Sequence, residues 1–266
     1  MARTAAAAAA RQNRAVDSAD VDLVLTVRSA LAAAADPDRA PGMQAYMKSA
    51  MPYLGIAAPT LRSVLRPILN EHPLPDEETW QATVLELWDG ARFREERYAA
   101  LAVARHRHHR EHQQVHTLDL YEHLIRTGAW WDLVDETAGH LVRDLLLNHR
   151  EEVTPVICSW AVSDDLWVRR SAIICQVDAR DQCDQALLAA VVEDNLDGST
   201  RTTPALSPHG REFFIRKAVG WALRDHARTA PDWVLGFVSA HEAQLSGLSR
   251  REALKHLGTG GAANQP

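Results

Sequence analysis

The sequence lacks the features of a membrane-spanning protein, a disulfide-stabilised protein and a β-sheet protein. No apolar run among the 266 residues approaches the length that spans a bilayer. No convincing run alternates apolar and polar residues as strands do. Cysteine is scarce, and its widely spaced positions in apolar helical surroundings favour reduced thiols in a cytoplasm over a disulfide framework or a zinc site. These positions are Cys158, Cys175 and Cys183.

Several signatures of catalysis are also missing. The sequence has no glycine-rich phosphate loop, no H-E-x-x-H pair and no G-x-S-x-G elbow. A histidine-rich stretch places His112 and His116 four residues apart, which is a spacing used by metal ligands on a helix. Because no cysteine lies nearby and the stretch falls between helices, we expect a solvated turn that becomes more basic as the pH falls. We therefore predict neither a metal nor another cofactor.

Helical periodicity dominates the rest of the sequence. Almost every periodic segment has the spacing of an amphipathic helix, so we predict an all-α fold. We expect an alanine-rich disordered tail at 1–18, a single domain at 19–257 with a polar inserted loop at 196–210, and a disordered tail at 258–266. The helices with the clearest expected bounds are 93–106, 115–127, 130–148, 153–162, 165–177, 182–195, 212–229 and 231–242.

Four segments align at an interval that suits a helical repeat. Their second residues are Tyr98, Asp135, Arg170 and Lys217, at spacings of 37, 35 and 47 residues, and the last gap holds the polar loop. Intervals in the high thirties suit a two-helix HEAT-like unit. We therefore predict a HEAT-like helical-repeat solenoid whose equivalent helices line one concave groove, with Asp135, Arg170 and Lys217 in a single trough.

One segment at the start of an expected helix places an indole beside a carboxylate. Trp131 and Asp135 are four residues apart and share one helix face. A buried Asp without a partner is costly and an indole N–H needs an acceptor, so this pair suits a groove that meets a polar, cationic ligand. The alternative is a helix N-terminus at which an aspartate favours the positive end of the dipole and Trp131 packs inward. Trp130 points away from Asp135, and we expect it to pack in the core.

Basic residues gather in the C-terminal half of the expected groove. Arg169 and Arg170 stand in a segment without acids, and Arg216 and Lys217 belong to a second basic segment. Either segment alone is better explained by a solvated helix face. Both occupy the same phase of the repeat and have aromatic neighbours, which favours a phosphate backbone as the ligand. The net charge of -6 argues against a uniformly basic surface but leaves room for a local basic groove.

Taken together, several motifs resemble those of the AlkD family of DNA glycosylases. The motifs are Ala45–Met47, Pro52–Ile56, Trp130–Asp135, Leu166–Ile173, Glu212–Trp221 and Ser249–Ala253. The resemblance implies an all-helical HEAT-like solenoid that removes cationic N3- and N7-alkylated purines, such as 3-methyladenine and 7-methylguanine, from duplex DNA without a cofactor. The chain departs from the family in the loop at 196–210 and in its alanine-rich leader, and neither deletes a motif residue.

The resemblance also assigns roles by motif position. Trp131, Asp135 and Trp221 would form the catalytic cluster, and Arg170 would contact the DNA backbone beside it. The expected DNA contacts are Tyr46, Arg169, Arg170, Arg216 and Lys217, with Lys217 interpreted as a phosphate contact rather than a Schiff-base lysine. We expect a monomer that acts in the cytoplasm and has no membrane association.

The expected chemistry needs only one acid. Glycoside cleavage usually employs two carboxylates, one of which protonates the leaving group. A purine alkylated at N3 or N7 is already cationic and leaves as a neutral base, so Asp135 alone would stabilise the charge that develops at C1′ and position water. Trp131 and Trp221 would flank the deoxyribose. The alternative is a HEAT-like scaffold that binds DNA or a protein without catalysis, because a fold does not fix a function.

Overall fold

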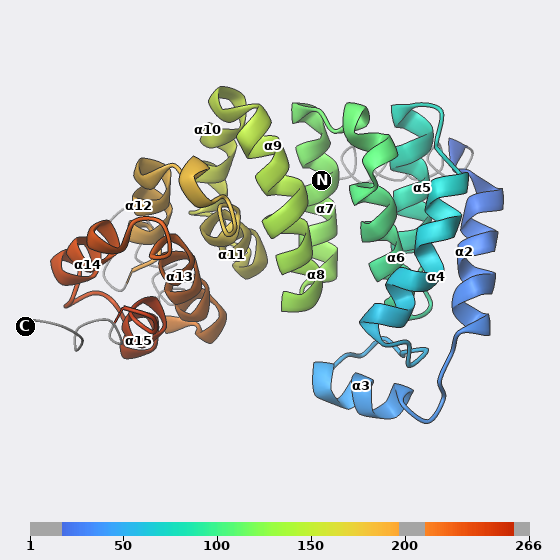
Figure 1. Ribbon diagram of the computed structural model, residues 1–266, viewed down its shortest axis with the longest axis horizontal. Helices are drawn as coiled ribbons and strands as arrows, with labels where there is room; N and C mark the ends of the chain where they lie inside the picture. Colours follow the sequence, from blue (N-terminus) through green and yellow to red (C-terminus); the bar gives the residue numbers. More distant parts are fainter. Residues whose placement is uncertain (1–17, 197–210, 258–266) are drawn as a thin grey trace, which may run out of the picture. The chain divides into compact units, whose positions relative to one another are not determined.

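The computed structural model describes residues 18–196 and 211–257 (Figure 1). Throughout these residues the regular structure is helical and no strand occurs, which confirms the predicted all-α class. The helices divide into two compact units, the first ending at Gln114 and the second beginning at Val115. In the described part of the chain, no helix is long and apolar enough to cross a membrane.

The predicted chain boundaries are tested only in part. The two expected tails and the expected loop at 196–210 lie outside the described residues, apart from Ser18 and Leu196 at their edges. The described helices between residues 19 and 257 fall into the two units. The single domain expected over this range stays a prediction.

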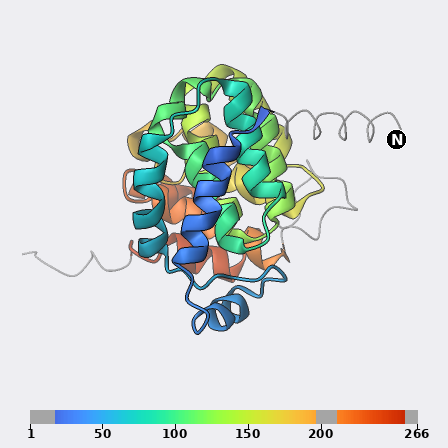
Figure 2. The ribbon, with the colours of Figure 1, turned by 90° about the vertical axis from the view of Figure 1, so that its right-hand side faces the viewer.

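The N-terminal unit is a helical bundle whose helix starts follow from the sequence. Its described helices are α2 (Val21–Ala33), α3 (Ala40–Met47), α4 (Ala58–Glu71), α5 (Glu77–Asp89), α6 (Arg94–Arg105) and the 3-10 helix Arg107–His112. Asp20 and Asp76 cap α2 and α5 by accepting hydrogen bonds from backbone N–H groups. Figures 1 and 2 both show α3 standing apart from α2, α4, α5 and α6.

A buried carboxylate fastens the loop between α3 and α4 to α6. Glu95 is fully buried, and its two oxygens accept hydrogen bonds from the N–H groups of Leu54 (2.9 Å), Gly55 (2.9 Å) and Ile56 (3.1 Å). Gly55 has a φ of 86°, and a Cβ there would lie 2.0 Å from the carbonyl oxygen of Asp36. Only glycine fits this position, and Glu95 satisfies donors that would otherwise be buried without an acceptor.

The histidine-rich stretch is partly buried, so the expectation of a solvated turn was wrong for its central residue. His109 is fully buried; its Nε2 accepts a hydrogen bond from the N–H of Leu74 (3.2 Å), which leaves Nδ1–H to donate to the carbonyl oxygen of Val103 (3.0 Å). This arrangement requires a neutral ring. Among the described residues, no three His, Cys, Asp or Glu side chains are grouped to hold a metal ion.

The C-terminal unit continues the series of helices. Its described elements are the 3-10 helix Val115–Thr117, α7 (Leu118–Gly128), α8 (Trp131–Glu136), the π-helical segment Thr137–Val142, α9 (Arg143–Asn148), α10 (Arg150–Trp160), α11 (Leu166–Ile174), the 3-10 helix Arg180–Gln182, α12 (Gln185–Glu193), α13 (Phe213–His226), α14 (Pro231–Ala240) and α15 (Gly247–Ala253). The helix predicted at 130–148 is thus α8 and α9 joined by a π-helical segment.

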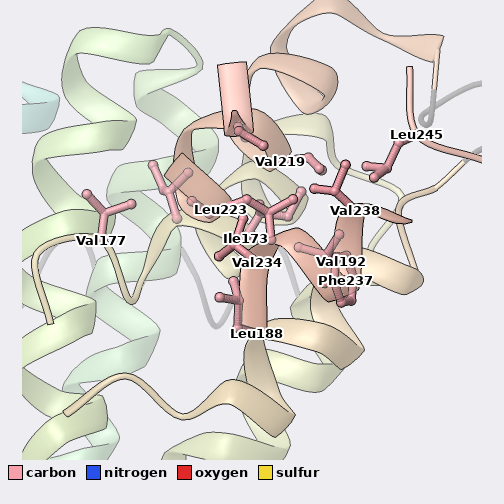
Figure 3. Packing of buried hydrophobic residues seen from close by; sticks show 14 of the residues in the cluster. Ile173, Val177, Leu188, Val192, Val219, Leu223, Val234, Phe237, Val238 and Leu245 are labelled. Carbon is pink, nitrogen blue, oxygen red and sulfur yellow. The ribbon is translucent and has the colours of Figure 1, made fainter. Parts of the chain in front are cut away.

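A contiguous apolar core joins the last helices of the C-terminal unit (Figure 3). Ile173 of α11, Leu188 of α12, Val219 of α13 and Val234 of α14 are each at most 1% exposed. Burial of such side chains contributes about 1.5–3 kcal/mol each relative to exposure. The core therefore fixes α11 and α13, the two helices that carry most of the predicted DNA contacts.

We predict that Glu95→Ala lowers the free energy of unfolding by about 3 kcal/mol or more, because two buried N–H groups and one partly buried N–H group lose their acceptor. Urea denaturation followed by circular dichroism measures this loss. The matched control is Glu71→Ala, which removes an exposed carboxylate from α4 and should change stability by no more than about 0.5 kcal/mol. Equal stability of the two variants would contradict the role of Glu95.

We also predict that the free energy of unfolding falls as the pH is lowered from 6.5 towards 4. Burial lowers the pKa of His106 from 6.5 to about 4, and burial also lowers the pKa of His109. The unfolded chain therefore binds more protons than the folded chain in this range, and acid favours unfolding. Urea titrations at several pH values should show a smaller loss for His106→Gln than for the wild type. The exposed control His256→Gln should lose as much as the wild type.

Candidate active site

The predicted catalytic segment lies on α8. Trp130 has an extended backbone before the helix, Trp131 is its first residue, and Asp135 follows one turn later on the same face. Both Trp131 and Asp135 are half-buried. The π-helical segment begins two residues after Asp135, and the hydroxyl of Thr137 donates to the carbonyl oxygen of Leu133 (2.8 Å). Single π-helical turns within α-helices occur frequently at functional sites.

A two-pronged ion pair holds the Asp135 carboxylate. Arg170 donates from Nε to Oδ1 (2.7 Å) and from Nη2 to Oδ2 (2.7 Å), and its Nη1 donates to the carbonyl oxygen of Phe214 (2.7 Å). The side chains of Asp135 and Arg170 are 16% and 5% exposed. Arg170 thus joins α8, α11 and the first turn of α13, which confirms that two of the residues expected at equivalent repeat positions meet in space.

Two opposing effects act on the acidity of Asp135. Burial raises the pKa of its carboxyl above the ordinary 3.8, while the hydrogen bonds and charge of Arg170 lower it, and Asp132 adds to the rise. The net direction is upward. A carboxylate that is removed from water and held by an arginine interacts strongly with a charge placed beside it, because little water screens that interaction.

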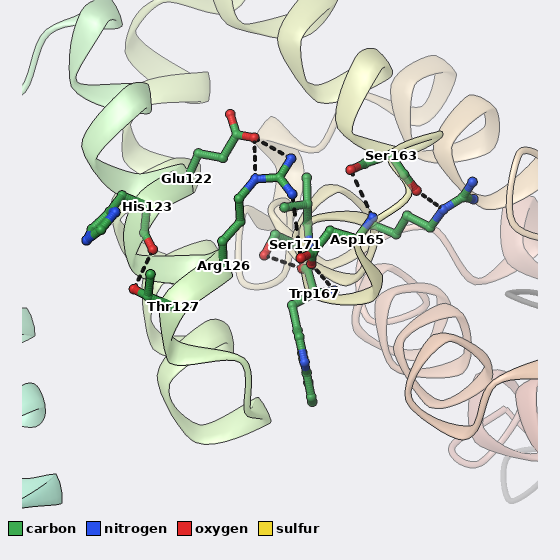
Figure 4. A network of polar contacts seen from close by, with 10 residues as sticks. Glu122, His123, Arg126, Thr127, Ser163, Asp165, Trp167 and Ser171 are labelled. Atoms are coloured by element: carbon green, nitrogen blue, oxygen red, sulfur yellow. Dashed lines mark hydrogen bonds and ion pairs between the residues drawn. The ribbon is translucent and has the colours of Figure 1, made fainter. Parts of the chain in front are cut away.

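Asp165 caps the N-terminus of α11, the helix that carries both Arg169 and Arg170 (Figure 4). Asp165 accepts hydrogen bonds from the N–H groups of Trp167 (2.8 Å) and Val168 (3.1 Å), and Arg126 lies 3.5 Å from its carboxylate. Successive helical residues point about 100° apart. With Arg170 directed at Asp135, Arg169 is therefore directed elsewhere.

Arg169 lies in the interior and does not fit its predicted role in DNA binding. Its side chain is fully buried and donates to the carbonyl oxygens of Ser163 and Ala161 (3.1 Å for Ala161) and to Oδ1 of Asn195 (3.0 Å). These bonds tie α11 to the end of α10 and to the segment after α12. The sequence pattern treated two adjacent arginines as one cationic cluster, but only tertiary contacts show that one of them is structural.

An aromatic cluster adjoins the ion pair. The rings of Trp130, Trp167 and Phe214 have centroids 4.9–5.8 Å apart, and the guanidinium carbon of Arg170 lies 6.0 Å from the Phe214 centroid. Trp130 is half-buried and packs against the Trp167 and Phe214 rings beside the ion pair, so it does not lie in the apolar core as expected. Phe214 is one of the aromatic neighbours of the predicted basic segment. The pattern did not predict that its backbone carbonyl oxygen accepts a hydrogen bond from Arg170, because every residue carries that group.

Helix α13 carries the remaining predicted residues of this unit. Trp221 is half-buried against the apolar core and lies two helical turns after Phe214, on the same stripe of α13. Lys217 forms an ion pair with Glu252 (2.7 Å), and Arg224 binds the other oxygen of the same carboxylate. The sequence therefore identified cationic residues on α13 but not the acid that pairs with two of them.

Helix α15 supplies that acid and packs tightly against α13. Its N-cap is Ser246, whose side chain accepts from the N–H of Ser249. The Ser249 hydroxyl donates to the carbonyl oxygen of Arg216 (2.9 Å). Arg216 is half-buried, and its Nε is buried without a hydrogen-bond partner among the described residues. Both Arg216 and Lys217 thus lie at the α13–α15 contact.

Tyr46 belongs to the other unit. It lies on α3 and is 79% exposed, the largest exposure among the exposed large hydrophobic residues of the described chain. An exposed aromatic on a helix that stands apart from its bundle is available to a ligand. Its place among the DNA contacts stays a prediction.

We predict that Gly220→Ala lowers the free energy of unfolding by about 1–3 kcal/mol, because overpacking forces α13 and α15 apart. A Cβ at this position would lie 2.5 Å from the Cβ of Glu252 and 3.0 Å from the carbonyl oxygen of Ser249. Gly236→Ala on α14 is the control, since its Cβ would meet nothing within 4 Å. Chemical denaturation should show the control neutral or more stable by up to about 1 kcal/mol. A control as unstable as Gly220→Ala would refute the packing argument.

Comparisons with known proteins agree with the motifs. A model of the family described as DNA alkylation repair enzyme matches residues 27–257. A solved structure described as a predicted DNA alkylation repair enzyme from Enterococcus faecalis is similar, with 29% identity, a TM-score of 0.70, and coverage of 85% of this chain and 97% of that one. A search of curated proteins gave no match. Because the family match spans most of the sequence and includes α8, α11 and α13, the chain belongs to the DNA alkylation repair enzyme family.

Proposed function

We propose that this protein is a monofunctional DNA glycosylase that hydrolyses the N-glycosidic bond of cationic N3- and N7-alkylated purines in duplex DNA. Membership of the DNA alkylation repair enzyme family supports a role in repair of alkylated DNA. The observation that carries the finer proposal is the Asp135 carboxylate, which is held in one orientation by Arg170 and lies one helical turn from Trp131.

The proposed reaction uses the charge of the damaged base. An alkylated purine cation leaves as a neutral base, so no residue has to protonate it. Positive charge then grows at C1′ of the deoxyribose, and Asp135 stabilises that charge and orients the attacking water. A carboxylate in a poorly hydrated site acts more strongly on a nearby cation than one in bulk water.

The two indoles act on the same charge. Trp131 and Trp221 contact the deoxyribose, whose C–H groups become more positive as the bond breaks, and the electron-rich indole faces attract them. A desolvated contact of this kind contributes on the order of 2 kcal/mol, which corresponds to tenfold or more in rate.

Arg170 serves first to orient the acid. Three of its donor bonds are to Asp135 and Phe214, and a guanidinium has five N–H groups. Two N–H groups therefore remain for a DNA phosphate. Lys217 and Arg216 contribute further backbone contacts, with Glu252 limiting how far Lys217 reaches, and Tyr46 contributes from the N-terminal unit.

We further propose a cytoplasmic monomer that needs no cofactor. The three cysteines are free thiols, and burial raises the pKa of Cys183 to about 11 and that of Cys175 still further. Thiols with raised pKa values are poorly reactive, which suits a structural role in a reducing compartment.

The same ion pair also suits a second candidate, a scaffold that binds DNA without catalysis. A buried carboxylate neutralised by an arginine is a common way to join helices, and Asp135 is only 16% exposed. The two candidates differ in whether the carboxylate charge is needed for release of a base.

We predict that Asp135→Asn lowers the rate of 7-methylguanine release from methylated duplex DNA by about 100-fold or more, because the charge opposite C1′ is lost. Binding to the same duplex should stay within about threefold. Single-turnover release measured by chromatography and binding measured by fluorescence anisotropy give the two values.

The matched control is Glu122→Gln, which removes a carboxylate from the ion pair with Arg126 in the same unit (2.6 Å). This variant should release base at the wild-type rate. Wild-type release by Asp135→Asn would exclude the catalytic role, and duplex binding by a wild-type protein that releases no base would favour the scaffold.

A further inference from the structure

One carboxylate of α15 binds two cations of α13. Oε1 of Glu252 lies 2.7 Å from Nζ of Lys217, and Nη1 of Arg224 donates to Oε2. Glu252 is 16% exposed, so little water competes for its oxygens. The hydrogen bond from Lys217, together with the charges of Lys217 and Arg224, lowers the pKa of Glu252 below its ordinary 4.5. The two cations therefore share one ionised counter-ion, which directs both charged groups towards α15.

The same two cations flank Trp221 on the surface of α13. Lys217 comes four residues before Trp221 and Arg224 three residues after it, so the three side chains share one helix face. Side chains at these spacings have Cβ atoms about 5–6 Å apart, which is within reach of a long basic side chain. An indole face attracts a cation that comes within about 6 Å of its centroid. Either cation, without a counter-ion, would be drawn to the face of the Trp221 ring.

Neither cation lies over the Trp221 ring. The cation–π contacts found among the described residues involve other rings. The charged groups of Lys217 and Arg224 are bound to Glu252 instead. A hydrogen bond between two ions is stronger than a partly exposed contact between a cation and a ring. The carboxylate therefore accounts for the absence of a cation on this indole.

Other contacts already hold α15 against α13. The hydroxyl of Ser249 donates to the carbonyl oxygen of Arg216 (2.9 Å), and Gly220 allows the two backbones to approach closely. Ala253 is fully buried in the apolar core that includes α13. The Glu252 carboxylate is thus one of several connections between the helices, and its place between two cations has a separate consequence for the ring that they flank.

We propose that Glu252 is a positioning residue for Trp221: by binding Lys217 and Arg224, it keeps the indole face free for the deoxyribose. The inference rests on the proposed glycosylase function, in which that face attracts the C–H groups of a sugar that becomes positive. A lysine or arginine over the ring would occupy the same place and repel the same charge. Glu252 thus acts on the reaction only through these two side chains.

The first test separates release of the base from binding of the DNA. With protein in saturating excess over methylated duplex, Glu252→Gln should release 7-methylguanine about tenfold more slowly than the wild type, because one indole contact is lost. Affinity for the duplex, measured by fluorescence anisotropy, should stay the same or increase, because Lys217 is freed to bind phosphate. A purely structural defect would weaken both properties, so a parallel loss of rate and affinity would count against the inference.

Two further variants show whether Glu252 acts through Trp221. In a Trp221→Ala background, adding Glu252→Gln should leave the rate of release unchanged, because the ring that the cations would cover is gone. The triple variant Lys217→Gln/Arg224→Gln/Glu252→Gln should recover the wild-type rate at saturating protein, because no cation remains to cover the ring. Losses that multiply in the first case, or no recovery in the second, would contradict the proposed route.

The matched control is Glu242→Gln, which removes an exposed carboxylate from its ion pair with Arg250 of α15 (2.8 Å). It should keep the wild-type rate. Trp221 fluorescence, taken as the difference between each protein and its Trp221→Phe variant, tests the inference without base release. Glu252→Gln should shift this emission, and the control should not.

The two readouts also separate this inference from the proposed function. A shift in Trp221 emission without base release by the wild-type protein removes only the glycosylase. Base release by the wild type, with neither a shift nor slower release in Glu252→Gln, removes only the role of Glu252.

Discussion

The paired hydrogen bonds between Arg170 and Asp135 are the interaction on which the candidate site depends. Asp135 lies on α8, Arg170 on α11, and the third bond of Arg170 reaches the first turn of α13. A carboxylate removed from water needs compensation from charge and hydrogen bonds. Arg170 supplies both and at the same time fixes the orientation of the two oxygens. The position of the acid is thus set by three helices rather than by its own helix alone.

Helix α13 is held from two sides. Arg170 binds the carbonyl oxygen of Phe214 near its start, while α15 contacts its middle, where the absence of a side chain at Gly220 allows close approach. Glu252 pairs with Lys217 and Arg224, which flank Trp221 along the helix. The Trp221 indole is therefore carried by a segment with little freedom to move, as its proposed catalytic role requires.

Much of the fold and part of the site could be predicted from the sequence. Periodic apolar residues and proline predicted the helix at 231–242, which is observed as Pro231–Ala240. The repeat interval predicted that Asp135 and Arg170 share a site, and they form an ion pair. The inward course of Arg169 and the burial of His109 were not predictable, because both depend on hydrogen-bond partners supplied by other segments. The spacing of residues along the sequence predicts which side chains share a helix face. It does not predict which arginine and lysine side chains are already bound by another residue.

The π-helical turn after Asp135 has a consequence for how this unit tolerates change. A π-helical turn contains one residue more than the α-helical turn it replaces, so it shifts the phase of the subsequent helical residues by about 100°. Along one continuous helix, the π-helical turn therefore fixes the angle between two faces. One is the face of α8 that carries Trp131 and Asp135, and the other is the face of α9 that packs against the core. Deletion of one residue between Thr137 and Val142 would keep this segment helical. It would also rotate α9 by about 100° relative to α8. Either the Asp135 carboxylate would then turn away from Arg170, or the apolar side chains of α9 would turn away from the core.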